Sequence, residues 1–229
     1  MKFKPSYTSS IAEDIMAERL IRAQAVEFLA DAPMRLKSGL ISPVYVDNRK
    51  LFSHPEAWRD IVETMASRVE EYDLEFDIVA GVEAAGSMHA AALAYRLGLP
   101  AIMVRQKAKT YGNHSRIEGG DVKGMRVLLL EDHISTGLSC LDAIRALRGE
   151  GAQVTQVMSI TNYAIPETQR LFKQEGIDTY DVIAFEKVVR KAKEMGVIDD
   201  EHEKLVLEWL QTPWTLAAMH VVVASAIEN

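Results

Sequence analysis

The segment from residue 126 to residue 139 constrains the fold more than any other part of the chain. It opens with an uninterrupted apolar run, Val127 to Leu130, which is typical of a short strand buried on both faces. Glu131 and Asp132 follow at the expected end of that strand, and Ile134 to Gly137 form a turn of small residues. Apolar residues then recur at helical spacing. The segment therefore predicts a strand, an acidic pair, a tight turn and a helix.

This arrangement suits a sugar phosphate. Backbone N–H groups at a helix N-terminus lack an intrahelical partner, and the helix dipole favours an anion there. Gly137 can adopt backbone angles that other residues resist, and Ser135 and Thr136 add hydroxyl donors. The carboxylates could accept hydrogen bonds from sugar hydroxyls, directly or through a divalent cation. An ordinary acidic loop is the alternative, and the segment contains neither a P-loop nor a dinucleotide-binding fingerprint.

Strand-like apolar runs alternate with helical patterns along most of the chain. The expected strands lie at residues 76–81, 99–104, 127–130, 153–160 and 180–185. Helical patterns occupy residues 11–29, 55–69, the stretch ending at 97, 166–174 and 185–210, with a break at Met195 and Gly196. Strands and helices that alternate in this way form parallel sheets with right-handed crossovers. The chain of 229 residues thus predicts one α/β domain.

Two segments carry basic residues in a chain whose net charge is -7. Alternation at 34–36 and 44–46 predicts two short strands, joined by a Ser-Gly turn and interrupted by Pro43. Residues 105–120 are polar and long for a connection in a compact domain. A solvated sheet edge and a solvated charge run are the ordinary interpretations. A cationic loop, however, is what closure over a diphosphate leaving group would need.

Together these segments resemble one known family. An acidic pair followed by Ser135-Thr-Gly137 after a Val/Leu-rich strand resembles the phosphoribosyl pyrophosphate loop of the type I phosphoribosyltransferases. Within that family, Leu36-Lys-Ser-Gly with Ser-Pro-x-Tyr45 resembles the hood of the orotate phosphoribosyltransferases, and Arg105-x-Lys-x-Lys109 with Ile-Glu-Gly resembles their catalytic loop. The resemblance runs from about residue 20 to about residue 210.

The resemblance implies a fold and a domain organisation. It implies an α/β type I phosphoribosyltransferase fold, with a central mostly parallel sheet flanked by helices and a small N-terminal hood. The whole chain, residues 1–229, would be a single phosphoribosyltransferase domain. The hood would occupy about residues 1–50, and a C-terminal helical segment at 185–229 would pack on the core.

The resemblance also implies roles for individual residues. Lys37 and Tyr45 would contact the flat, anionic base. The substrate-binding segment around the turn would comprise Glu131, Asp132, His133, Ile134, Ser135, Thr136, Gly137, Leu138 and Ser139. The expected catalytic residues are Arg105, Lys107, Lys109 and Asp132. Tyr111 stands where the family has a histidine; it can still donate a hydrogen bond to phosphate, but it carries no positive charge near neutral pH.

Besides Tyr111, three features depart from the family pattern. Ala84 replaces the usual threonine of the pyrophosphate-side loop, and Glu83 adds a negative charge beside a polyanion site. An Asp-Arg pair, whose arginine meets the orotate carboxylate in many members, is absent from residues 160–166. The partner of that carboxylate is therefore unassigned.

The implied activity is transfer of ribose 5-phosphate from 5-phosphoribosyl 1-diphosphate to orotate, in pyrimidine biosynthesis. Mg²⁺ would be held mainly by substrate and not by protein side chains. A homodimer is implied, with loop 105–120 of one subunit reaching its partner's site. The acidic composition disfavours nucleic acid, and no apolar stretch is long enough to span a bilayer. A lone cysteine, Cys140, and an N-terminus without an apolar signal segment indicate the cytoplasm.

Three alternatives remain at this stage. The chain could be a phosphoribosyltransferase for another base, because of the departures at Ala84, Tyr111 and the missing arginine. It could be a non-catalytic regulator that binds phosphoribosyl pyrophosphate, although the acidic pair and the cationic loop are retained. A structural α/β domain without a ligand would leave the polar loop 105–120 without a function.

Overall fold

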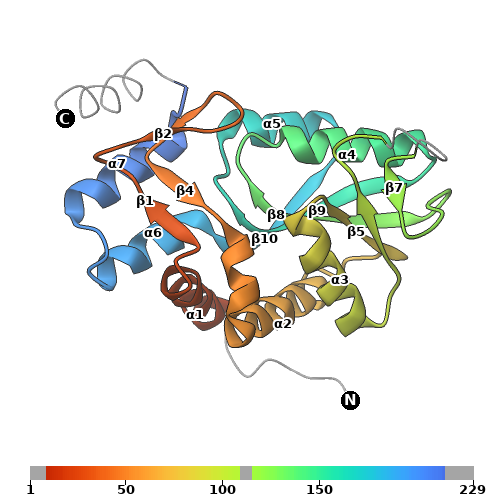
Figure 1. Cartoon of the computed structure of the whole chain (residues 1–229), viewed down its shortest axis with the longest axis horizontal. Helices are drawn as coiled ribbons and strands as arrows, with labels where there is room; N and C mark the ends of the chain where they lie inside the picture. Colours follow the sequence, from red (N-terminus) through yellow and green to blue (C-terminus); the bar gives the residue numbers. More distant parts are fainter. Residues whose placement is uncertain (1–8, 109–114, 215–229) are drawn as a thin grey trace.

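A six-stranded sheet forms the centre of the computed structural model, which describes residues 9–108 and 115–214 (Figure 1). Its strands, in chain order, are β5 (Ile78–Val82), β6 (Ala101–Val104), β7 (Ile117–Glu118), β8 (Arg126–Ile134), β9 (Gln153–Asn162) and β10 (Asp178–Ala184). The order across the sheet is β10-β9-β8-β5-β6-β7, and only the pairing of β6 with β7 is antiparallel. The prediction of a mostly parallel α/β sheet is confirmed.

Helices cover both faces of this sheet. The described helices are α1 (Ser9–Arg22), α2 (Pro55–Glu71), α3 (Ala85–Leu97), α4 (Leu138–Gly149), α5 (Pro166–Gln174), α6 (Phe185–Glu194) and α7 (Asp200–Gln211), with a 3-10 helix η1 (Asn48–Ser53). Figure 1 shows α4 and α5 on one face, and α1, α2 and α3 on the other. No described helix is both long enough and apolar enough to cross a bilayer.

Strand β8 is buried on both faces, as its apolar run predicts. Leu128 and Leu130 pack in the core that contains α1, α2 and α3, whereas Val127 and Leu129 pack in the core that contains α4. The strand is longer than expected, however. Its ladder with β9 continues to Ile134, which pairs with Asn162, so the acidic pair lies inside the strand and not at its end.

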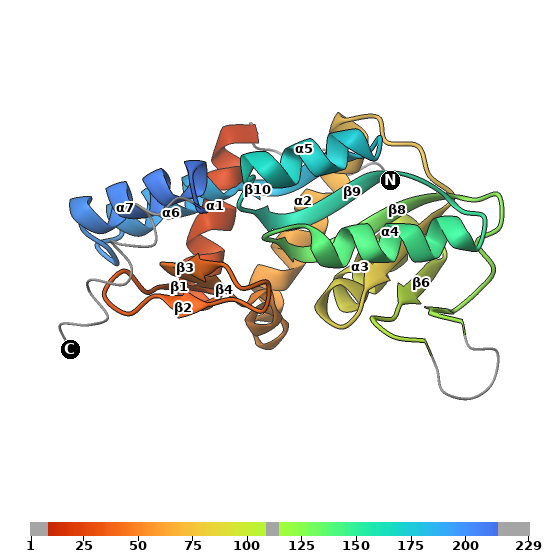
Figure 2. The same ribbon diagram turned by 90° about the horizontal axis from the view of Figure 1, so that it is seen from above.

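The hood consists of two small antiparallel sheets. Strand β1 (Val26–Phe28) pairs with β4 (Val44–Val46), and β2 (Met34–Arg35) pairs with β3 (Ile41–Ser42). Figure 2 shows these strands beside α1 and α7. The expected partnership of residues 34–36 with 44–46 is therefore wrong. Gly39, with φ +88°, turns the chain back so that β3 meets β2, and Pro43 separates β3 from β4.

The first helix is also shorter than the helical pattern suggests. It ends at Arg22 instead of near residue 29, because Gln24 takes a left-handed backbone angle (φ +53°) and residues 26–28 enter the β1–β4 pairing. Residues 26–28 form a strand despite their helical apolar spacing, because pairing with β4 outweighs the local helical preference.

The C-terminal helices pack against the hood. The predicted break at Met195 and Gly196 is confirmed, since α6 ends before it and Gly196 has φ +70°. The indole N–H of Trp209 in α7 donates to the carbonyl oxygen of Ile41 at 2.9 Å. Residues 215–229 lie outside the described part of the chain, so a single domain over all of 1–229 stays a prediction.

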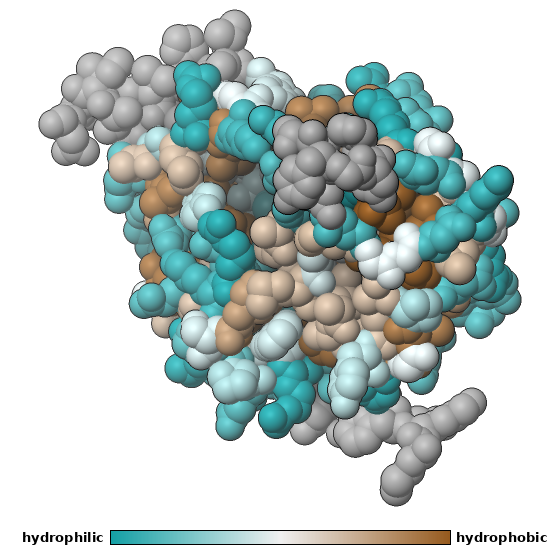
Figure 3. All heavy atoms as spheres, turned by 45° about the vertical axis from the view of Figure 1, so that its right-hand side comes forward, coloured by the Kyte–Doolittle hydropathy of each residue, from teal (hydrophilic) through white to brown (hydrophobic). Residues whose placement is uncertain are grey.

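An apolar surface lies over α3. Tyr95 is 90% exposed and Met88 is 47% exposed. A groove of about 600 Å³ between α2 and α3 is lined by apolar or aromatic residues, among them Trp58, Val62 and Tyr95, and by the charged residues Arg59, Glu63 and Arg96. Figure 3 views this side of the molecule and shows weakly apolar surface gathered between hydrophilic borders. Exposed apolar patches of this kind mark interaction surfaces.

Candidate active site

The turn between β8 and α4 requires glycine at position 137. Gly137 is the N-cap of α4 and has φ +73°, a backbone angle that residues with a side chain resist and that the sequence allows at this glycine. A Cβ atom at this position would lie 2.9 Å from Cγ2 of Thr168 and 3.0 Å from Cε2 of Phe172. The helix N-terminus is therefore held close to α5. Leu138 and Ser139, the first residues of α4, remain exposed.

A cavity of about 400 Å³ lies where the hood meets this turn. The hood contributes Lys37 and Tyr45, and the end of β8 contributes His133. The other residues around it are Leu36, Ser38, Val46, Ser135, Thr136, Leu138, Ser139 and Tyr163. The cavity thus combines an aromatic ring and a lysine on one side with hydroxyls and a helix N-terminus on the other, which suits a flat base joined to a phosphorylated sugar.

The acidic pair directly precedes the cavity residue His133 in β8. Glu131 is only 7% exposed, and Cβ of any side chain at Gly86 would lie 3.3 Å from its Oε1 atom. Burial raises the pKa of Glu131 well above its usual range, and the neighbouring Asp132 carboxylate adds to the shift. Burial also raises the pKa of Asp132, while Arg49 acts in the opposite direction. Burial therefore favours the protonated form of both groups, and any hydrogen bond that a ligand makes with them in this poorly solvated place is strengthened.

Asn48 joins the hood segment to the central sheet. Its side-chain nitrogen donates to the backbone oxygen of Asp132 at 2.7 Å and to Oγ1 of Thr161 at 3.1 Å. The Thr161 hydroxyl also contacts Nδ1 of His133 at 2.9 Å. Burial lowers the pKa of His133 to about 3, so its ring is neutral at physiological pH. His133 consequently forms an uncharged part of the cavity wall, packed edge-on against Tyr163.

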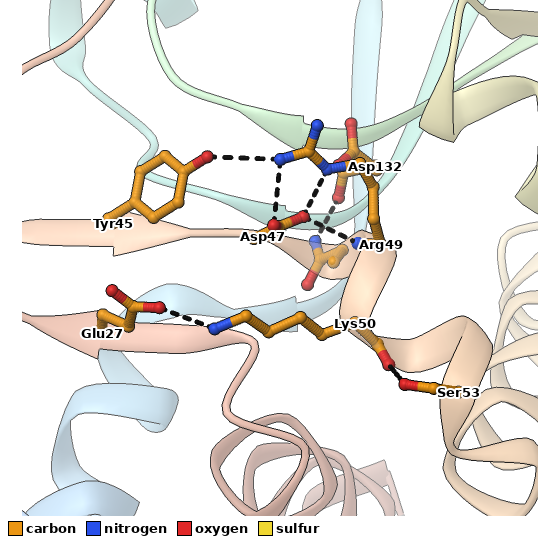
Figure 4. Close-up of polar contacts among 8 residues, drawn as sticks. Glu27, Tyr45, Asp47, Arg49, Lys50, Ser53 and Asp132 are labelled. Carbon is orange, nitrogen blue, oxygen red and sulfur yellow. Dashed lines mark hydrogen bonds and ion pairs between the residues drawn. The ribbon is translucent and has the colours of Figure 1, made fainter.

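A cation stands beside Tyr45 at the start of η1. Arg49 donates from Nε to Oδ1 of Asp47 at 2.5 Å and from Nη2 to Oδ2 at 2.9 Å. The same Nη2 atom lies 3.4 Å from the Tyr45 hydroxyl. Figure 4 shows the guanidinium between Tyr45 and Asp132, while Lys50 points away toward Glu27.

The polar loop after β6 is part of a hairpin. Strands β6 and β7 are antiparallel, so the loop does not connect two parallel strands of the sheet. Arg105 donates to Glu118 at 3.1 Å, and the Glu83 carboxylate accepts the backbone N–H of Gln106 at 3.0 Å. Glu83 therefore faces the start of the loop. Lys107 is exposed, whereas Lys109 and Tyr111 lie outside the described residues.

The donor set suits a magnesium ion that substrate shares. Within residues 9–108 and 115–214, no group of three or more His, Cys, Asp or Glu side chains could hold a metal ion. Glu131 and Asp132 offer the oxygen ligands that Mg²⁺ prefers, and this cation usually keeps several waters and substrate oxygens. The two carboxylates thus fit a cation whose other ligands come from substrate and water.

Comparisons with known proteins identify the family. Residues 47–194 match the model of the phosphoribosyl transferase domain. An orotate phosphoribosyltransferase of Coxiella burnetii is 41% identical over 198 residues, which cover 86% of this chain and 95% of that protein. The chain belongs to the orotate phosphoribosyltransferase family.

Solved structures agree with this assignment to the orotate phosphoribosyltransferases. The structure of Leishmania donovani UMP synthase matches with a TM-score of 0.76 and 27% identity, covering 87% of this chain and 42% of that chain. A Mycobacterium tuberculosis orotate phosphoribosyltransferase in complex with 5-phospho-alpha-D-ribosyl 1-diphosphate matches with a TM-score of 0.60 and 26% identity, covering 77% of this chain and 98% of that chain.

Within this orotate phosphoribosyltransferase fold, most of the expected substrate-binding residues gather around the cavity. Those that line it are Lys37, Tyr45, His133, Ser135, Thr136, Leu138 and Ser139. Gly137 is the N-cap residue of the helix that follows the turn, whereas Glu131 and Asp132 precede His133 in β8 and do not line the cavity. Ile134 is 2% exposed and packs in the core, so its side chain supports the site from inside. Arg105 and Lys107 do not line the cavity.

Sequence reasoning missed several residues of this orotate phosphoribosyltransferase site. Asp47, Asn48 and Arg49 follow directly after the hood strand β4, Thr161 lies near the end of β9, and Tyr163 follows that strand. The available signal was the run of polar residues that begins at Asp47, directly after Val46 at the end of a strand that enters the site. Their partners are distant in the chain, so their contacts have no local pattern.

Proposed function

We propose that this chain transfers the ribose 5-phosphate of 5-phosphoribosyl 1-diphosphate to orotate, giving orotidine 5′-phosphate and diphosphate in pyrimidine biosynthesis. One observation carries the proposal. The hood residues Lys37 and Tyr45 line the same cavity as the turn residues Ser135, Thr136 and Ser139. A base and a sugar phosphate bound there would be neighbours, as the reaction needs.

The reaction is a displacement at the anomeric carbon of the ribose. The ring nitrogen N1 of orotate forms the new C–N bond and loses its proton, and diphosphate departs with the electrons of the C–O bond. Positive charge develops on the sugar and negative charge on the leaving group. Catalysis therefore needs positioning and charge stabilisation more than a nucleophilic side chain.

The floor of the cavity would hold the sugar. In the proposal, Asp132 and Glu131 accept hydrogen bonds from the ribose hydroxyls, and carboxylates beside the sugar favour its developing positive charge. The turn from Ser135 to Ser139 would hold the 5-phosphate through hydroxyls and the N–H groups that begin α4. The exposed first turn of α4 supports this role, because an anion can reach it.

Cations of the hairpin loop would neutralise the departing diphosphate. The candidates are Arg105, Lys107 and Lys109, with Tyr111 as a further hydrogen-bond donor. The Arg105 side chain now pairs with Glu118. Its contact with diphosphate would require an exchange of partners, from the Glu118 carboxylate to the diphosphate oxygens.

Mg²⁺ belongs to the proposal as a cofactor. Glu131 and Asp132 would provide its protein oxygens, and the diphosphate and ribose would provide most of the others. When bound, the ion would neutralise charge on the diphosphate oxygens.

A homodimer that shares the 105–120 loop between subunits is also proposed. The exposed apolar surface on α3, with Tyr95 and Met88, supports an interface on that side of the molecule. The compartment proposed is the cytoplasm, which fits the free thiol of buried Cys140.

A turnover assay tests the activity. Purified protein, Mg²⁺, phosphoribosyl pyrophosphate and orotate are combined, and the loss of orotate absorbance and the release of diphosphate are followed, with uracil, hypoxanthine and adenine in parallel. Turnover with orotate alone is expected. Turnover with another base would replace the proposed substrate, and binding of phosphoribosyl pyrophosphate without turnover on any base would indicate a regulator.

A further inference from the structure

The site as described leaves the carboxylate of orotate without a partner. The strand β9 ends in Thr161 and Asn162, Tyr163 follows it, and none of these residues carries a positive charge. Lys37 is the cation that lines the cavity itself. A second cation lies just outside, on the side of the acidic pair. This is Arg49, at the start of η1.

The carboxylate of Asp47 fixes the orientation of the Arg49 guanidinium. Asp47 binds its guanidinium through two nitrogens, at 2.5 and 2.9 Å. This bidentate geometry restrains the plane of the group as well as its position. Asn48, the next residue along the chain, is hydrogen-bonded to the Asp132 backbone and to Thr161. The arginine is therefore held at a defined place relative to the floor of the site.

The remaining donors of Arg49 are available to a ligand. Its side chain is 59% exposed, and Nη1 makes no hydrogen bond with a described residue. In Figure 4 this nitrogen lies on the side of the guanidinium away from Asp47. Nη2 lies 3.4 Å from the Tyr45 hydroxyl, so the free edge stands at the rim of the cavity that Tyr45 lines.

The chemistry of orotate determines where its negative charge must lie. Its carboxylate is attached to the carbon next to N1, and N1 is the atom that joins the ribose. A base that contacts Tyr45 and reacts with a ribose held by Asp132 therefore presents its carboxylate between those two residues. Arg49 occupies that interval in Figure 4.

We propose that Arg49 binds the carboxylate of orotate and thereby selects an anionic base. The inference rests on the proposed function and deepens it by naming the residue that recognises the substrate's charge. Asp47 acts as a positioning residue, because it orients the guanidinium and leaves the outer edge free. Burial raises the pKa of Asp132, and the charge of Arg49 acts against that rise, so the same cation moderates repulsion between Asp132 and the anionic base.

KM values for the two substrates distinguish binding of the orotate carboxylate by Arg49 from a role of Arg49 on the sugar side. The variants Arg49→Met and Arg49→Lys are compared with the wild type, with KM measured separately for orotate and for phosphoribosyl pyrophosphate. Loss of a charge-assisted hydrogen bond is expected to raise the orotate KM by about 10- to 100-fold in Arg49→Met. Arg49→Lys should recover part of this loss, and the KM for phosphoribosyl pyrophosphate should stay within about twofold.

A neutral analogue provides a second readout. The methyl ester of orotate keeps the ring but has no carboxylate charge, so its inhibition constant should be nearly the same in the wild type and in Arg49→Met. The matched control is Lys50→Met, which removes a neighbouring cation that pairs with Glu27 away from the cavity. This control should leave both KM values unchanged.

A double variant covers the case in which Arg49→Met folds poorly. Arg49→Met leaves the Asp47 carboxylate without its partner, and combining it with Asp47→Asn removes that charge.

The outcomes distinguish the inference from the proposed function. An unchanged orotate KM in a folded Arg49→Met protein would overturn the inference alone. A rise confined to the KM for phosphoribosyl pyrophosphate would also overturn it, and would assign Arg49 to the sugar side. A wild-type protein that turns over no orotate would overturn the proposed function, and the inference with it.

Discussion

At the scale of single residues, Glu131 shows how a functional group can oppose folding. The carboxyl is buried next to another carboxyl, and both effects raise its pKa. Folding therefore favours its protonated form. Stability associated with this group is fully present below the pKa of the unfolded chain, about 4.3, and is lost as pH rises toward the folded pKa.

Replacement of Glu131 by glutamine should accordingly stabilise the fold while it impairs function. The free energy of unfolding should rise by about 1–2 kcal/mol at pH 8 and by much less near about pH 3, because the wild-type group is then protonated in both states. Turnover should fall, since the amide is a weaker acceptor for a ribose hydroxyl. Chemical denaturation at both pH values gives the comparison, and a stability difference independent of pH would contradict it.

The residues that the sequence predicts best are those whose role depends on neighbours in the chain. Glu131, Asp132 and Gly137 belong to one continuous motif, so their grouping follows from local order. Arg49 does not, because its significance depends on Tyr45, Asp47 and Asp132 meeting in space. A family resemblance indicates an anionic base, but the structure is needed to find a cation at the right rim of the cavity.

At the scale of elements, the turn before α4 is the most constrained connection in the site. Gly137→Ala should lower the free energy of unfolding by about 1–3 kcal/mol, because the residue has positive φ and its Cβ would crowd Thr168 and Phe172. The KM for phosphoribosyl pyrophosphate should rise as well, since the N-terminus of α4 would move.

A control in the same helix isolates that effect. Gly149 ends α4, and a Cβ there would meet nothing within 4 Å. Gly149→Ala should therefore change neither the free energy of unfolding nor the KM for phosphoribosyl pyrophosphate appreciably. Thermal unfolding and steady-state kinetics measure these two quantities for both variants. Similar losses in the two proteins would show that α4 merely tolerates substitution poorly and that the turn has no special role.

The element predictions succeed where one pattern determines one structure. The apolar run of β8 and the amphipathic patterns of α2, α5, α6 and α7 give the observed elements. Pairing in the hood is different, because alternation identifies strands but not their partners. Residues 34–35 meet 41–42, and 26–28 meet 44–46, through tertiary contacts that the local pattern does not contain. The hairpin of β6 and β7 was missed for the same reason.

At the scale of the whole molecule, sharing of the loop between subunits has a direct test. Lys109→Ala and Asp132→Asn should each abolish most activity, because they remove the loop cation and the floor carboxylate. When the two variants are denatured together and refolded, mixed dimers should regain one intact site each, or about a quarter of the wild-type activity for random pairing. Each variant refolded alone provides the control. A mixture that stays inactive, despite mixed dimers shown by mass spectrometry, would place loop and floor in the same subunit.

Four hydrogen bonds from separate elements hold the hood against the rest of the molecule. Asn48 donates to the Asp132 backbone and to Thr161, Tyr163 donates to the backbone of Val44, and Trp209 donates to that of Ile41. The gap between hood and floor is therefore set during folding, before any substrate arrives. The fixed spacing between the hood and the central sheet therefore selects ligands by the thickness of the ring that enters it. It accepts a planar ring with little loss of conformational entropy, because the walls that contact the ring are already ordered.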